Sequence, residues 1–260
     1  MSTLSYSDEY IRLNVPGKPR RLLLRTPQRL TGDPALLIEL AKDCTGTLDD
    51  HPYNQASMLF LAAGHRVASF DLPNHGDDVN DFGEGLAGMA KAVAAGVDVF
   101  EQIRAAAQET VKLVLARGLT RPGRIYAAGT SRGGLSSLHA MVGEPAIAAA
   151  AAYAPVTHLP VLSEFAPIAD LPLVKANNAV SLIDRLVGRD IFIAIGMNDA
   201  RVGTSHCLDF HARLELANRT GTVILHVDYA DGHSASDAAR HLGATFLLDR
   251  AARACRVPYA

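Results

Sequence analysis

Short apolar runs alternate with longer segments of helical periodicity along most of this chain. The short runs are rich in Val, Ile, Leu and Ala, which is typical of parallel strands whose two faces are both covered. Such an alternation predicts a parallel sheet with helices on both sides. Six parallel strands are expected, over residues 35–40, 65–70, 124–128, 147–154, 190–195 and 222–227.

The first two apolar runs have a different connection. Residues 10–15 and 21–25 are separated only by Pro16, Gly17 and a few polar residues. So short a connection suits an antiparallel hairpin, because two parallel strands need a much longer crossover. The chain as a whole therefore predicts an eight-stranded, mostly parallel sheet.

Helical periodicity fills most of the segments between these strands. Residues 155–178, after the sixth strand, are rich in Pro and lack strong periodicity, so we expect a short lid-like insertion there rather than a domain. No repeat or linker divides the chain, and residues 1–260 are expected to form one domain. The predicted helices cover 52–63, 86–117 with a break near Gly96, 133–142, 179–186, 205–217 and 236–253.

Composition narrows the functional classes. With 260 residues, 48% of them hydrophobic, the chain can bury a large core, which excludes global disorder. The net charge is −2 and no basic stripe is present, so nucleic acid is not an expected partner. The three cysteines have no metal-like or disulfide-like spacing. The N-terminus lacks an apolar signal core and no apolar window could span a bilayer, so a cytoplasmic protein without a membrane partner is expected.

One motif carries chemistry. Gly129, Ser131 and Gly133 form a Gly-x-Ser-x-Gly pattern between a predicted strand and a predicted helix. In this arrangement a tight, strained turn lifts the serine hydroxyl clear of the sheet, and the glycines leave room for the neighbouring chain. The N–H of Arg132, at the start of the helix, would face a developing oxyanion. The structural alternative is a plain glycine-rich turn in which Ser131 caps the helix.

A serine hydroxyl needs a base, and the base needs a carboxylate that orients it. Asp199 follows the seventh predicted strand and His233 follows the eighth. Carboxyl ends of parallel strands meet at one edge of a sheet, so these side chains and Ser131 are expected to converge. Asp231 and Asp228 are rivals for the acid, but they lie on the same loop as the histidine, whereas the acid of a triad normally arrives from another strand.

These motifs together give the chain a family resemblance. The Gly129–Gly134 turn, the Asp199–Val202 segment and His233 resemble the α/β-hydrolase fold enzymes, most of all the esterases related to prolyl oligopeptidase and dienelactone hydrolase. The resemblance covers roughly residues 8–255. It implies an α/β-hydrolase fold, with Ser131 as nucleophile, His233 as general base and acid, and Asp199 as the orienting carboxylate. It implies no metal and no organic cofactor.

The chain departs from the family pattern after the third strand. Relatives usually carry a His-Gly pair there, and its neighbour supplies one oxyanion N–H; here the loop reads Ala-Lys-Asp-Cys-Thr-Gly from residue 41. The backbone N–H of Lys42 or Asp43 is expected to take that role beside the N–H of Arg132. Cys44, in the same loop, is interpreted as a small buried residue rather than a second nucleophile. His75, which precedes Gly76 after the fourth strand, is interpreted as structural.

Two further residues are candidates for the substrate pocket. His158 and Leu159 follow the sixth strand, at the edge of the sheet where the triad is expected. An exposed loop histidine is an equally supported interpretation of His158. The remaining histidines have no spacing typical of a metal site.

Three functions remain in view. The first is a serine hydrolase of carboxylic esters, with a small-molecule ester as its substrate. The second is a small peptidase or amidase of the prolyl-oligopeptidase type, placed after the ester because the chain supplies no large propeller domain of the kind that restricts access in those enzymes. The third is a binding or regulatory protein that keeps the fold without turnover; the unusual loop after the third strand favours it, and the complete triad argues against it.

Overall fold

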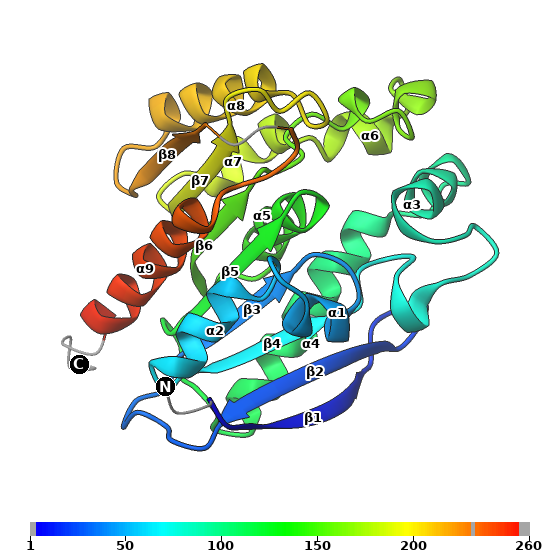
Figure 1. Ribbon diagram of the computed structural model, residues 1–260. Coiled ribbons are helices and arrows are strands. Elements are labelled where there is room, and N and C mark those ends of the chain that lie inside the picture. Colours follow the sequence, from blue (N-terminus) through cyan, green and yellow to red (C-terminus); the bar gives the residue numbers. More distant parts are fainter. Residues whose placement is uncertain (1–3, 230–231, 255–260) are drawn as a thin grey trace.

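The computed structural model describes residues 4–229 and 232–254. Within these residues, one eight-stranded sheet runs through the molecule in the order β1-β2-β4-β3-β5-β6-β7-β8 (Figure 1). Strands β3 to β8 are parallel, as their patterns predict. The strands are β1 Tyr6–Leu13, β2 Arg20–Pro27, β3 Leu36–Leu40, β4 Arg66–Phe70, β5 Ile125–Thr130, β6 Ile147–Tyr153, β7 Asp190–Gly196 and β8 Val223–Asp228.

The predicted hairpin at the start of the chain is confirmed. β1 pairs antiparallel with β2, and β2 pairs antiparallel with β4. β1 begins at Tyr6, before the apolar run, because its first residues are exposed at the sheet edge and need no apolar side chains. The strand order and the mostly parallel pairing are those of the α/β-hydrolase fold.

Helices cover both faces of the sheet. α1 Cys44–Asp49, α2 Gln55–Ala62 and α9 Asp237–Ala254 lie on one face, in front of the sheet in Figure 1. α5 Arg132–Gly143 contacts the opposite face together with α8 Thr204–Ala217. The other helical segments are η1 Gly76–Asp78, α3 Gly85–Ala94, α4 Val99–Ala116, η2 Leu159–Val161, η3 Ala166–Ile168, α6 Pro172–Ala176, η4 Ala179–Leu182 and α7 Ile183–Leu186.

The predicted break near Gly96 is confirmed. α3 ends at Ala94, Gly96 takes a φ of +85°, and α4 begins at Val99. The carboxylate of Asp98 caps α4 by accepting hydrogen bonds from the N–H groups of Phe100 and Glu101. The short helix α1 was not predicted, since 6 residues are too few to show a helical period.

The segment between β6 and β7 consists of short helical turns rather than regular long elements, as its proline content predicts. Leu162 and Phe165 bury their side chains against the rest of the molecule, and Glu164 forms an ion pair with Arg201 after β7. This segment therefore packs on the edge of the sheet. Its action as a lid stays a prediction.

No helix among the described residues is both long enough and apolar enough to cross a membrane.

A buried carboxyl group lies under α2. Glu39 of β3 is 2% exposed, and it accepts hydrogen bonds from the N–H of Ser57 at 2.8 Å and from the Ser57 hydroxyl. Burial raises the pKa of Glu39 to about 7, because the hydrogen bonds from Ser57 and the charge of Arg240 only partly offset the loss of water. The folded protein therefore holds a proton that the unfolded chain releases near pH 4.5.

This difference predicts a pH-dependent stability. As the pH rises from about 5 to 8, the unfolded chain is already ionised at Glu39 while the folded protein must give up its proton, so wild-type stability falls. Glu39→Gln does not titrate. Its free energy of unfolding, relative to wild type, is expected to rise by about 2–3 kcal/mol between pH 5 and 8. Urea denaturation at both pH values measures this, with the exposed Glu215→Gln as control. A difference that stays constant with pH would contradict the raised pKa.

Candidate active site

The Gly-x-Ser-x-Gly segment forms a sharp turn between β5 and α5. Ser131 adopts φ 59° and ψ −119°, a strained conformation for a residue other than glycine. Its N–H donates to the carbonyl of Tyr153 at 2.8 Å, and its own carbonyl accepts from the N–H of Val156 at 3.2 Å, so β6 and the segment after it hold the turn.

Both glycines of the turn are required by close approach. A Cβ on Gly133 would collide with the carbonyl group of Leu40 at the end of β3, and one on Gly129 would collide with the carbonyl of Gly133. The turn therefore packs closely against the end of β3, and this close packing constrains the direction of the Ser131 side chain.

Three side chains from three strand ends meet at this turn. His233 Nε2 lies 2.8 Å from Ser131 Oγ, and His233 Nδ1 lies 2.8 Å from Asp199 Oδ2. Asp199 follows β7 and is 3% exposed, and His233 follows β8. A carboxylate only accepts, so Nδ1 carries the ring proton and Nε2 is left to accept the proton of the serine hydroxyl. The contact expected between Asp199 and His233 is thus present.

Backbone hydrogen bonds keep Asp199 ionised. Its Oδ1 accepts from the N–H groups of Arg201 and Val202, at 3.0 and 3.1 Å. Burial alone would raise the pKa of Asp199, but the hydrogen bonds from His233, Val202 and Arg201 outweigh it and hold that pKa below its usual value. Of the two rival acids, Asp228 accepts from the N–H of Ser236 at 2.8 Å, while Asp231 lies outside the described residues.

Ser131 and His233 line a cavity of about 220 Å³. This is smaller than most pockets for drug-sized ligands. Its walls include four side chains that the sequence motifs do not identify: Tyr53 before α2, Arg132 on α5, Arg201 after Asp199, and Arg240 on α9. From the sequence, Arg132 and Arg201 could have drawn attention, because Arg132 directly follows Ser131 and Arg201 lies two residues after Asp199.

The oxyanion side of the cavity differs in part from the expectation. The N–H of Lys42 donates to the Thr47 hydroxyl at 3.1 Å, so it is engaged within its own loop. The Asp43 carboxylate caps α1 by accepting from the N–H of Gly46 at 2.9 Å. The residue of this loop that lines the cavity is Ala41, opposite Arg132. The structure thus does not support Lys42 as a donor, because the unpredicted helix α1 turns the loop back on itself.

Comparison with known proteins identifies the family of this chain and finds the same fold in solved structures. Residues 93–247, more than half of the chain, match the prolyl oligopeptidase family. The chain belongs to the prolyl oligopeptidase family. Its members are serine hydrolases, and the turn at Ser131 lies inside the matched region. No curated protein matches the chain.

Solved structures of both peptidases and esterases are similar. A prolyl endopeptidase superimposes with a TM-score of 0.68 at 19% identity, over 94% of this chain and 39% of its own. An esterase from an Arctic intertidal metagenomic library gives 0.71 at 16%, over 96% of each chain. The Pyrococcus furiosus esterase Pf2001 gives 0.66 at 18%, over 95% of this chain and 93% of its own. The chain thus spans about two fifths of the endopeptidase and nearly all of each esterase.

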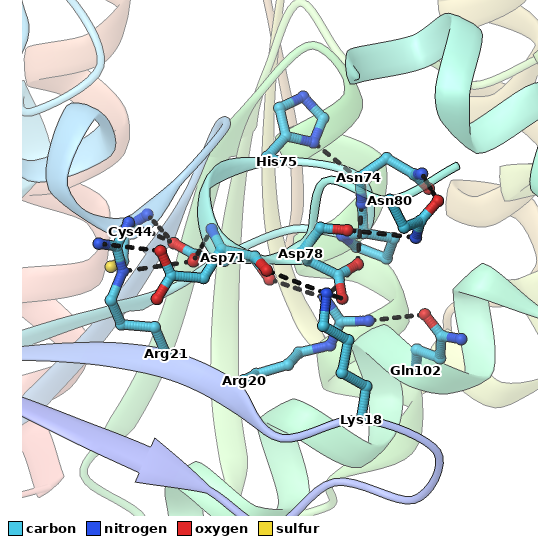
Figure 2. Close-up of polar contacts among 12 residues, drawn as sticks. Lys18, Arg20, Arg21, Cys44, Asp71, Asn74, His75, Asp78, Asn80 and Gln102 are labelled. Atoms are coloured by element: carbon cyan, nitrogen blue, oxygen red, sulfur yellow. Dashed lines mark hydrogen bonds and ion pairs between the residues drawn. The ribbon is translucent and has the colours of Figure 1, made fainter. Parts of the chain in front are cut away.

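The loop after β4 supports the loop after β3 through several polar contacts (Figure 2). Asp71 accepts from the N–H of Cys44 at 2.8 Å and pairs with Arg21 of β2 at 3.3 Å. Leu72 donates its N–H to the carbonyl of Lys42 at 3.1 Å. Burial raises the pKa of Cys44 to about 12, with Asp71 adding to the shift, so its thiol stays protonated and is not a nucleophile near neutral pH.

His75 lies in the same loop after β4. It is buried, and its Nδ1 contacts the carbonyl of Pro73 at 2.8 Å (Figure 2). Burial, helped by the positive charge of Arg132, lowers the pKa of His75 to about 4, so the ring is neutral. Nearby, Asp78 accepts from the N–H of Asn74 and pairs with the buried Arg20 at 3.1 Å. These contacts support the structural interpretation of His75.

Neither predicted pocket residue, His158 or Leu159, is among those that line the Ser131 cavity. His158 stacks on His206, with ring centroids 4.4 Å apart. Leu159 is buried and lines a second, small apolar cavity, which shares Leu86 and Arg132 with the first. The described residues contain no group of three metal-ligating side chains that could hold a metal ion.

Proposed function

We propose that this chain is a serine hydrolase that acts through an acyl-enzyme on Ser131. The observation that carries the proposal is the continuous hydrogen-bond chain from Ser131 Oγ through His233 to the buried Asp199. A triad is recognised by such geometry and by the roles it allows, rather than by sequence position. The strained turn that presents the hydroxyl supports the same assignment.

The geometry supports the following steps. Ser131 Oγ attacks the substrate carbonyl carbon while its proton passes to His233 Nε2, and Asp199 stabilises the imidazolium. The negative charge on the carbonyl oxygen is stabilised by the N–H of Arg132 and, we propose, by that of Ala41. The tetrahedral species collapses as His233 returns the proton to the leaving group. Water then loses a proton to His233, attacks the acyl carbon and releases the acid, and Ser131 regains its proton.

We further propose that the substrate is a small carboxylic ester. Two esterases are among the similar solved structures, and each is similar to this chain over more than nine tenths of its length. A cavity of about 220 Å³ suits a small ester better than a folded peptide segment. The family match favours a second candidate, cleavage of short peptides or amides.

A matched panel separates these candidates. 4-Nitrophenyl esters of acetate, butyrate and octanoate are compared with the corresponding 4-nitroanilides and with aminoacyl nitroanilides. Each rate is divided by that of the uncatalysed reaction, since esters are intrinsically more reactive. We expect the largest rate enhancement for the short esters. A larger enhancement for the aminoacyl anilides would favour the peptidase, and no enhancement for any compound would favour a non-catalytic protein.

A further inference from the structure

The cavity at Ser131 is lined by three arginines and, among the described residues, by no aspartate or glutamate. Arg132, Arg201 and Arg240 come from three separate parts of the chain: the elbow, the loop after β7, and α9. A catalytic serine and a neutral imidazole do not require such a concentration of positive charge. The ion pairs and hydrogen bonds of each guanidinium group therefore bear on the kind of ligand that the cavity can bind.

Two of the three guanidinium groups already have partners in the fold. Arg201 forms an ion pair with Glu164 at 2.6 Å, so its charge is largely balanced. Arg240 is 2% exposed; it donates to the Thr130 hydroxyl at 2.6 Å and to the Ala235 carbonyl at 3.3 Å. Both are held in place by contacts within the protein.

Arg132 is different. Its side chain is partly buried. Among the described residues it forms neither an ion pair nor a side-chain hydrogen bond, and its Nε is buried without a hydrogen-bond partner. Burial lowers the pKa of its guanidinium, with Arg201 opposing and Tyr53, Glu164 and Glu84 favouring the charge only from farther away. An arginine nevertheless stays charged in a protein. His75, whose pKa the charge of Arg132 helps to lower, is neutral and supplies no counter-charge.

A cation that loses part of its water without gaining a partner is destabilised, and a ligand that brings an anion removes that cost. The guanidinium fork matches a carboxylate, which can accept two parallel hydrogen bonds. Because Arg132 directly follows Ser131 and the cavity is small, that carboxylate must lie only a few bonds from the carbonyl under attack.

We propose that the preferred substrates are esters that carry a carboxylate near the scissile bond, and that the Arg132 side chain binds this carboxylate. This inference rests on the proposed hydrolase function and names its substrate class. Arg201 and Arg240 add positive potential to the cavity, which attracts an anion and repels a cationic substrate.

The test compares esters that differ only in the charged group. Monomethyl glutarate is paired with methyl pentanoate for the acyl side, and 3-acetoxypropanoate with propyl acetate for the alcohol side. We expect wild type to prefer the anionic member of at least one pair by about tenfold or more in kcat/KM. Arg132→Gln should lower that preference by about tenfold, and Arg132→Lys should restore part of it. Arg213→Gln, which removes an exposed arginine of α8, should leave the preference unchanged.

A binding measurement separates failure of this inference from failure of the proposed function. Monomethyl glutarate and 3-acetoxypropanoate are titrated into Ser131→Ala, where neither is cleaved, beside their neutral partners. Tighter binding of an anionic ester, weakened by 0.5 M NaCl and lost when Arg132→Gln is added, supports the carboxylate site even if wild type hydrolyses none of the four. Equal binding and equal kcat/KM within both pairs would overturn it. If Arg132→Gln fails to fold, the kcat/KM ratio within each pair is measured for wild type at low salt and in 0.5 M NaCl. A preference for the anionic ester that falls with salt supports the carboxylate site, and the absence of any such preference contradicts it.

Discussion

Replacing Ser131 with alanine is expected to lower ester hydrolysis by about 10³-fold or more. Among the described residues, Ser131 is the one whose hydroxyl lies within hydrogen-bond distance of His233 Nε2, at 2.8 Å, so it can attack a carbonyl carbon while passing its proton to the ring. The backbone contacts of the turn do not involve this hydroxyl, so the fold should persist. Steady-state kinetics with 4-nitrophenyl acetate measure the loss, and circular dichroism checks the fold.

Ser137→Ala provides the matched control. Ser137 is a buried serine on α5, the helix that follows Ser131. Its hydroxyl donates to the carbonyl of Gly134 at 2.8 Å, and it does not line the cavity. Its replacement should leave kcat/KM within a few-fold of wild type. Near-wild-type hydrolysis by Ser131→Ala would show that another group is the nucleophile.

Asp199→Asn is expected to lower turnover by up to about 10⁴-fold with little loss of stability. An asparagine can present an N–H to His233 Nδ1, which favours the tautomer with the proton on Nε2, and that tautomer cannot accept the proton of Ser131. The asparagine oxygen can still accept the N–H groups of Arg201 and Val202. Measurements of kcat, together with urea denaturation, separate the loss of catalysis from a loss of folding.

Two other carboxylates serve as controls for this assignment. Asp228→Asn removes a charge that caps the start of α9 through Ser236, and Asp231→Asn removes the charge two residues before His233. Both should lower kcat far less than Asp199→Asn. If Asp231→Asn were the more damaging change, the acid would have to be reassigned, although the contact between Ser131 and His233 would stand.

The sequence predicts those parts of the site that follow from the glycine pattern of the turn and from the topology of a parallel sheet. Gly129 and Gly133 mark the turn at Ser131 because only glycine tolerates such close contact with β3 and within the turn. Asp199 and His233 are predictable because parallel strands end at one edge of the sheet, which brings residues 34 positions apart together.

The remaining parts depend on how distant segments pack. Lys42 is a reasonable oxyanion donor from its place after β3, but the six residues of α1 redirect its N–H to Thr47. His158 lies at the expected edge of the sheet, but its ring stacks on His206 and it is not among the residues that line the cavity at Ser131. The arginines of the cavity come from α5, α9 and the loop after β7, and no sequence period connects them.

The central claim, that Ser131 is an activated nucleophile, is tested most directly by covalent labelling with a fluorophosphonate followed by mass spectrometry. Only a serine whose proton can pass to a base should react rapidly with this reagent. The account predicts one adduct per chain, located on Ser131, and none on Ser131→Ala. Folded wild-type protein that stays unlabelled, or an adduct that forms on another residue, would contradict it.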